Sequence, residues 1–231
     1  MTSKLLKLTK FTGALALAGL VSACASSGSI DNPFERRLTW FSYMEGGDLR
    51  AACAPGAANQ YRLVYNAVYQ EQVRTYDIDA NGQLEVRVIE PANLMHLDVS
   101  KFRDLFNPWR GEVTSRLLGA SSLEALVQSL KQDGAFGPPA VGTELSSRGF
   151  FWTIAACHEG AYHFTGLAWP SDPWDGATFD DVVFDLDPSP IAVNPPRKTV
   201  TTRDTRRGSW QANESWFHTK VGENGLFGTL D

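Results

Sequence analysis

Two histidines and a glutamate lie close together in this sequence and could bind a metal ion. His158, Glu159 and His163 form the pattern H-E-x-x-x-H, one residue longer than the H-E-x-x-H of zinc proteases. The zinc-protease motif needs both histidines one turn apart on a helix, whereas Gly160 indicates a turn. In a hairpin, His158 and His163 would be diagonal neighbours, roughly 7–8 Å apart at Cβ. A metal could then bridge them with Glu159 or His96 as a third ligand; two structural histidines are the alternative.

Opposite charges follow one another after residue 171. Residues 172–187 contain six aspartates and no base. Clustered carboxylates suit calcium, but the glycine and final glutamate of a calcium loop are missing, which favours a solvated acidic loop. The basic residues that follow are Arg197, Lys198, Arg203, Arg206 and Arg207. We expect this basic cluster either to bind an anionic ligand or to pair with the acidic stretch upstream.

Two tryptophans lie in a proline-rich loop that begins at Trp169 and includes Trp174. Rigid aromatic side chains in such a loop stack on sugars or hold peptide segments, which makes both tryptophans candidate ligand-binding residues. The alternative is that they fold back onto the core.

The elements that must position these residues are mostly strands. Residues 60–69 are dominated by aromatic and β-branched side chains and have the two-residue alternation of a strand. Residues 71–78 continue in extended character. The sequence Asp-Ala-Asn-Gly at 79–82 predicts a tight turn. Beyond it, apolar residues alternate with polar ones to about residue 89, which is typical of a half-buried strand. Residues 60–89 therefore predict an antiparallel meander.

Residues 149–169 predict a hairpin. A turn at Glu159-Gly160 places Phe150 opposite Trp169 and Trp152 opposite Leu167. Both faces of this hairpin are apolar, so we expect both to be covered; a face that lines a pocket is the alternative. After Trp169 the sequence is rich in proline, and only 181–186 and 199–202 are strand-forming.

One amphipathic helix is predicted at about 122–133. Ser121 and Glu124 have the spacing of a capping box, and Gly134 is placed to end the helix. The apolar stripe of this helix consists of Leu123, Leu126, Val127 and Leu130. Together the elements predict an α+β fold that is mostly antiparallel β, either a sandwich or a partly open barrel.

The first 24 residues have the parts of an export signal. A basic segment with three lysines precedes a short apolar run at 11–20, and Val21-Ser22-Ala23-Cys24 follows. This segment resembles a bacterial lipoprotein signal, with Cys24 in the invariant position of the lipobox. The resemblance implies lipid attachment to the Cys24 sulfur and cleavage before it. Because Ala25 and Ser26 follow Cys24 instead of aspartate, the resemblance also implies that the protein is anchored at the periplasmic face of the outer membrane.

The chain then divides into a signal peptide at 1–23, a flexible tether at 24–32 and a single domain at 33–231. Cleavage would remove three lysines and no acid, which changes the net charge from −5 to −8. Such an acidic body argues against binding to nucleic acid. Cys53 and Cys157 are the two remaining cysteines, and in an oxidising compartment we expect them to form a disulfide; two free thiols are the alternative.

The sequence contains no nucleophile elbow, phosphate loop or dinucleotide fingerprint, and no cofactor is predicted. We therefore expect a non-enzymatic binding or assembly module of the cell envelope, anchored in the membrane by lipidated Cys24. Its partner would be an envelope protein or an anionic or glycan ligand. The alternative is an envelope hydrolase that uses carboxylates or a metal held by His158 and His163.

Overall fold

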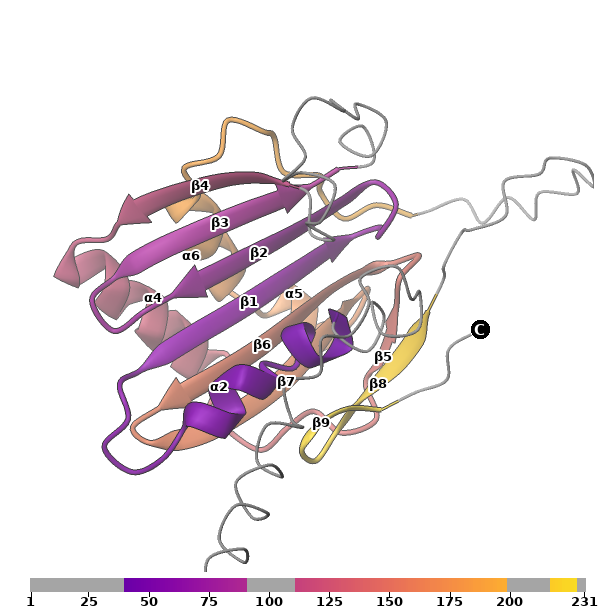
Figure 1. The fold of residues 1–231 in the computed structure, drawn as a ribbon. Helices are drawn as coiled ribbons and strands as arrows, with labels where there is room; N and C mark the ends of the chain where they lie inside the picture. The colour runs from indigo at the N-terminus through magenta and orange to yellow at the C-terminus, as the bar shows by residue number, and fades with distance from the viewer. Residues whose placement is uncertain (1–39, 91–110, 199–216, 228–231) are drawn as a thin grey trace, which may run out of the picture.

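A computed structural model describes residues 40–90, 111–198 and 217–227 (Figure 1). Its main element is an antiparallel sheet of six strands in the order β4-β3-β2-β1-β6-β7. The strands are β1 (Gln60–Ala67), β2 (Gln72–Ile78), β3 (Gln83–Ile89), β4 (Glu112–Leu117), β6 (Phe150–His158) and β7 (Ala161–Trp169). A separate small sheet contains β5 (Glu144–Ser146), β8 (His218–Gly222) and β9 (Gly225–Phe227). The predicted class, α+β and mostly antiparallel β, is confirmed, and neither sheet closes into a barrel.

The meander over 60–89 is confirmed by the pairing of β1 with β2 and of β2 with β3. The turn at 79–82 forms because Asp79 Oδ1 accepts hydrogen bonds from the backbone N–H groups of Asn81 and Gln83, both at 2.9 Å. Gly82 completes it with a φ of +82°, a conformation that residues with a Cβ adopt only with strain.

The β6–β7 hairpin has the predicted register. Phe150 lies opposite Trp169, and Trp152 lies opposite Leu167. Glu159 and Gly160 form its turn with φ values of +52° and +74°. Positive φ at both central residues gives the turn a twist that matches that of the flanking strands.

Both faces of the main sheet are covered (Figure 1). On one face the larger apolar cluster lies under α4 (Ala120–Gln132), α5 (Asp172–Asp175) and α6 (Phe179–Leu186), and Trp152 is 1% exposed within it. On the other face α2 (Gly47–Ala52) and the small sheet lie against the second cluster, which contains Met44, Phe151 and Val221. The expectation that both hairpin faces are covered is therefore confirmed.

The predicted helix is observed as α4, but the predicted capping box is wrong. The chain turns directly after buried Leu118, so the helix begins at Ala120 with Gly119 as its N-cap and no side-chain cap. Ser121 therefore lies inside the first turn, where its hydroxyl cannot cap the helix. The predicted stop is confirmed: Gly134 has a φ of +78°, and the backbone N–H of Ala135 donates to the carbonyl of Leu130 at 2.8 Å.

The strand predicted at 181–186 is wrong, because these residues belong to helix α6. Phe179, Val183 and Leu186 follow a helical spacing and are buried on the sheet. Asp133, at the end of α4, caps the N-terminus of α6. Its Oδ2 accepts hydrogen bonds from the backbone N–H groups of Thr178 at 2.7 Å and Phe179 at 2.8 Å. The second predicted strand, at 199–202, lies outside the described residues.

Candidate functional site

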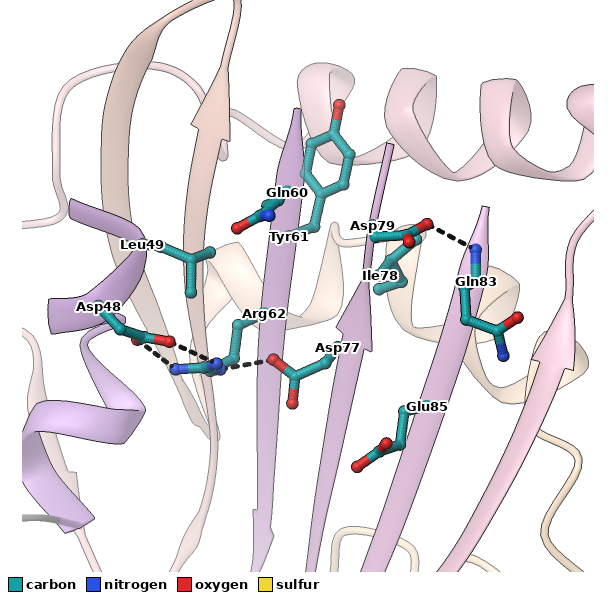
Figure 2. Close-up of a pocket in the computed structure, with 10 residues that line it drawn as sticks. All are labelled: Asp48, Leu49, Gln60, Tyr61, Arg62, Asp77, Ile78, Asp79, Gln83 and Glu85. Atoms are coloured by element: carbon teal, nitrogen blue, oxygen red, sulfur yellow. Dashed lines mark hydrogen bonds and ion pairs between the residues drawn. The ribbon is translucent and has the colours of Figure 1, made fainter. Parts of the chain in front are cut away.

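An open pocket of about 360 Å³ lies between α2 and the paired ends of β1, β2 and β3 (Figure 2). Its lining residues are Asp48, Leu49, Gln60, Tyr61, Arg62, Asp77, Ile78, Asp79, Gln83 and Glu85. The lining contains four carboxylates and one guanidinium group, so the pocket is acidic.

The sheet register brings the charged residues of the pocket together. Arg62 on β1 is the partner of Asp77 on β2, and Asp77 is in turn the partner of Glu85 on β3. Directly opposite residues of antiparallel strands project from the same face, so the three side chains form one row. This row lies on the face that α2 partly covers, and α2 adds Asp48 beside Arg62 (Figure 2).

Arg62, at the end of the row beside α2, is only 8% exposed and pairs with carboxylates on both sides. Its Nε donates to Asp77 Oδ1 at 2.6 Å, while Nη1 and Nη2 donate to the two oxygens of Asp48 at 2.7 and 3.1 Å (Figure 2). The bidentate pair with Asp48 fixes the guanidinium plane. The guanidinium carbon also lies 3.9 Å from the ring centroid of Tyr43, a cation–π contact.

The contacts of this network shift the pKa values of Tyr43 and Asp48. Burial disfavours the ionised phenolate of Tyr43, and the charge of Asp77 adds to this effect, so the Tyr43 pKa is raised and its hydroxyl donates to Asp77 Oδ2 at 2.5 Å. Burial alone would raise the pKa of Asp48, but the hydrogen bonds and charge of Arg62 outweigh it and lower that pKa. Asp48 and Arg62 are therefore held in their charged forms.

The two carboxylates in the outer part of the pocket, Asp79 and Glu85, interact with groups other than Arg62. Asp79 accepts hydrogen bonds from its own turn, and Glu85 forms an ion pair of 3.2 Å with Arg87 on the same strand. The side chain of Glu85 is 49% exposed. This surface can bind cationic or hydrogen-bond-donating groups from solution, whereas its charge opposes an anion.

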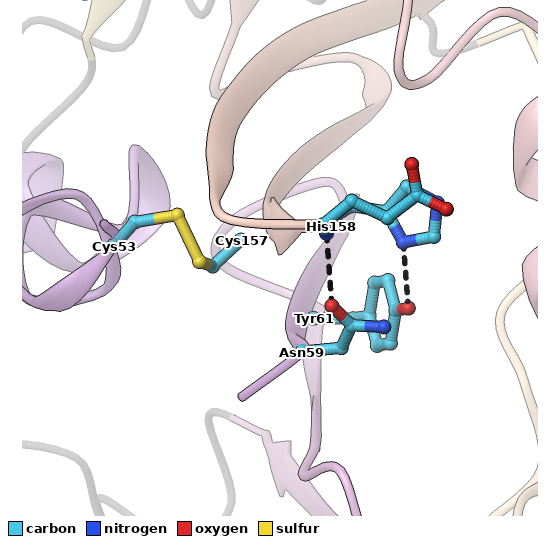
Figure 3. The surroundings of a disulfide bond; sticks show 6 residues. Cys53, Asn59, Tyr61, Cys157 and His158 are labelled. Carbon is cyan, nitrogen blue, oxygen red and sulfur yellow. Dashed lines mark hydrogen bonds and ion pairs between the residues drawn. A yellow bond between two sulfur atoms is a disulfide. The ribbon is translucent and has the colours of Figure 1, made fainter. Parts of the chain in front are cut away.

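A disulfide between Cys53 and Cys157 joins the C-terminal end of α2 to β6 (Figure 3). The prediction of this pair is confirmed, with a Cα–Cα distance of 5.5 Å. Cys53 is the C-terminal cap of α2, and Cys157 on β6 is the register partner of Gln60 on β1. The bond therefore holds α2 against the sheet, and with it Asp48 against Arg62.

The two histidines of the predicted metal site lie at the same end of the sheet but contact aromatic residues. His158 Nδ1 is 3.0 Å from the hydroxyl of Tyr61 (Figure 3), and the ring of Phe136 stacks on His158 at 4.2 Å. Phe136 also lies 5.6 Å from the ring of His163. Burial, and then the charge of His158, lowers the pKa of His163.

Glu159, the nearest carboxylate, has its Oε1 at 3.9 Å from His158 Nε2, and His96 lies outside the described residues. Within the described ranges, no group of three or more His, Cys, Asp or Glu side chains is arranged to hold a metal ion. The aromatic contacts give both histidines a packing role.

Of the other predicted ligand-binding residues, those that the structure describes do not line the pocket. Trp174 is 9% exposed in α5, with its ring 6.3 Å from that of Tyr65, so it belongs to the core and not to an exposed platform. Trp169 is half-buried against Phe150 at 6.0 Å. Arg197 pairs with Glu71 and not with the acidic stretch. The remaining predicted residues, Cys24, Arg203, Arg206 and Arg207, lie outside the described residues.

Sequence reasoning missed the network of Arg62, Asp77 and Asp48. An arginine among the apolar side chains of a predicted buried strand was the available signal, since a buried charge needs a partner. The partners themselves depend on the strand register and on the docking of α2.

Among the described helices, none is long and apolar enough to cross a membrane. Comparisons of the chain with protein-family models, with curated proteins and with solved structures found no match.

Proposed function

We propose that this protein is a lipoprotein of the bacterial cell envelope, anchored by Cys24 at the periplasmic face of the outer membrane, whose domain is a non-enzymatic binding or assembly module. The observation that carries this proposal is the disulfide between Cys53 and Cys157. Disulfides persist in oxidising compartments such as the periplasm and are rare in the cytosol. The disulfide therefore agrees with the export signal that the sequence of residues 1–24 resembles.

The acidic pocket beside α2 is the binding site that we assign to this module. Its ionised row is preorganised, because Arg62 is held on three sides and α2 is tied down by the disulfide. Preorganisation lowers the entropic cost of binding. The exposed Glu85 favours a cationic group of an envelope protein as the ligand. An anionic ligand at Arg203, Arg206 and Arg207 stays a prediction.

Fatty-acid labelling tests the anchor. The parent chain should incorporate labelled palmitate in cells, and Cys24→Ser should abolish the label and block normal processing. Unchanged labelling of the variant would contradict the anchor at this residue.

Photo-cross-linking in intact cells tests the binding site. A photoreactive amino acid replaces Gln83 in the pocket, and in a matched control it replaces Glu124, which is exposed on α4 behind the sheet. We expect a defined product from position 83 alone, and Glu85→Lys should weaken it by placing a positive charge in the pocket. The same products from both positions would show that the pocket does not select a ligand.

A further inference from the structure

In the described part of the chain, strand β4 leaves one edge of the main sheet unpaired. It is the terminal strand of the sheet, and among the described residues only β3 pairs with it (Figure 1). Its residues are exposed apart from half-buried Thr114, and the apolar side chains of Val113 and Leu117 are 45% and 68% exposed. A six-residue strand with a free edge is a template for pairing with another strand.

The hydrogen bonds to β3 show which backbone groups of β4 point outward. The N–H of Leu118 donates to the carbonyl of Gly82 at 2.8 Å, which continues the β3–β4 register. Since backbone groups alternate along an antiparallel strand, the even-numbered residues of β4 bond to β3. Val113, Ser115 and Leu117 therefore direct their N–H and C=O groups toward the open edge.

We propose that β4 pairs with β4 of a second copy of this chain, antiparallel and with the two-fold axis at Ser115. In this register Ser115 meets Ser115 of the second copy, and Val113 meets Leu117 of the second copy on either side of the axis. All three pairs join outward-pointing residues, so they would exchange about six backbone hydrogen bonds. The exposed apolar side chains also become cross-strand neighbours on one face.

The charges of β4 favour a second copy over an unrelated strand. Glu112 and Arg116 are exposed and lie on the opposite face from Val113 and Leu117, because side chains alternate along a strand. In the proposed register Glu112 is the diagonal neighbour of Arg116 of the second copy, within reach of both long side chains. The two-fold axis produces this pair twice. The strand is therefore complementary in charge to itself when reversed.

The pairing also closes after two copies. The opposite edge strand, β7, packs against α5 and β5 and takes no part in the proposed contact. An isologous contact between identical patches ends at the dimer. The interface is distinct from the acidic pocket, which lies between α2 and β1–β3.

Cysteine cross-linking of the purified full-length chain in detergent tests the register. At a hydrogen-bonded pair the Cα atoms lie about 5.5 Å apart, within the range of a disulfide. Ser115→Cys should therefore give a dimer on mild oxidation that reductant reverses, whereas Glu124→Cys, exposed on α4, should not. Equal cross-linking of both variants, or none at position 115, would overturn the proposal. Stronger cross-linking at Thr114→Cys would overturn this register.

Charge exchange at exposed positions of β4 tests whether the strand that pairs with β4 belongs to a second copy of this chain. In detergent, sedimentation should show a dimer for the parent chain. Arg116→Glu or Glu112→Arg alone should weaken it about tenfold, since each replaces two attractive pairs by repulsive ones. The double exchange, or an equal mixture of the two single variants, should restore the dimer. A monomeric parent chain, or single variants that dimerise like the parent, would exclude the second copy as the occupant.

Discussion

Arg74 on β2 and Asp187 at the end of α6 form a buried ion pair, with Nη1 at 2.5 Å from Oδ2, although 113 residues separate them in the chain. Their side chains are only 1% and 5% exposed. Tyr76 also donates to Asp187 Oδ2 at 2.9 Å, and the Arg74 guanidinium donates to the carbonyl of Ile191. This network fixes the end of α6 and the segment that follows it against the main sheet.

Asp187→Asn should destabilise the protein by about 3–5 kcal/mol, because it leaves the buried Arg74 guanidinium without its counter-charge. Urea denaturation of the full-length chain in detergent measures the loss. Asp185→Asn, an exposed position on the same helix, is the matched control and should change the free energy of unfolding by no more than about 0.5 kcal/mol. Equal changes in the free energy of unfolding for the two substitutions would show that the ion pair does not stabilise the fold.

Reduction of the disulfide between Cys53 and Cys157 should lower the stability by up to about 4.7 kcal/mol, because the bond closes a loop of 104 residues in the unfolded chain. The same loss is expected for the double variant Cys53→Ser, Cys157→Ser. Thiol titration of the native protein should find neither of the two thiols until reductant is added. Release of α2 should also increase hydrogen exchange around Asp48 more than in the β6–β7 turn.

Trp152→Ala should cost about 3–5 kcal/mol, because it removes a fully buried side chain between the sheet and α6. Trp169→Ala, on the same hairpin but half-buried, is the comparison and should cost less. Trp174→Ala should also destabilise the fold, since Trp174 is 9% exposed. Thermal melts of the three variants decide the order. A Trp152→Ala protein that melts like the parent would contradict the burial of this face.

Stability should fall as the pH falls below 6.5, in part through His163. Burial lowers its pKa in the folded state from the ordinary 6.5, so between these two pKa values the unfolded chain binds a proton that the folded chain does not. The loss is absent above pH 6.5 and complete below the folded pKa. Urea melts at pH 7.5 and 5.5 should show a smaller difference for His163→Gln than for the parent. An unchanged difference in His163→Gln would contradict this contribution.

Local sequence determined the three strands of the meander at 60–89, the β6–β7 hairpin and the stop of α4. The β6–β7 register was predictable because an apolar strand pair with one turn signal leaves a single alignment, and Glu159-Gly160 supplied that turn. The meander at 60–89 followed from alternation and from the turn at 79–82 for the same reason. The disulfide was predictable because the two cysteines were the only pair left for an oxidising compartment.

Only the tertiary structure decided the start of α6, the partners of the buried arginines and the acidic pocket. Helix α6 begins where Asp133, from a different helix, caps it, so residues 181–186 considered alone looked like a strand. The charge of Arg62 is balanced by Asp77 across a strand pair and by Asp48 from α2. Local propensity depends on neighbours in the chain, whereas a buried charge is stabilised by whichever opposite charge the packing brings within about 3 Å.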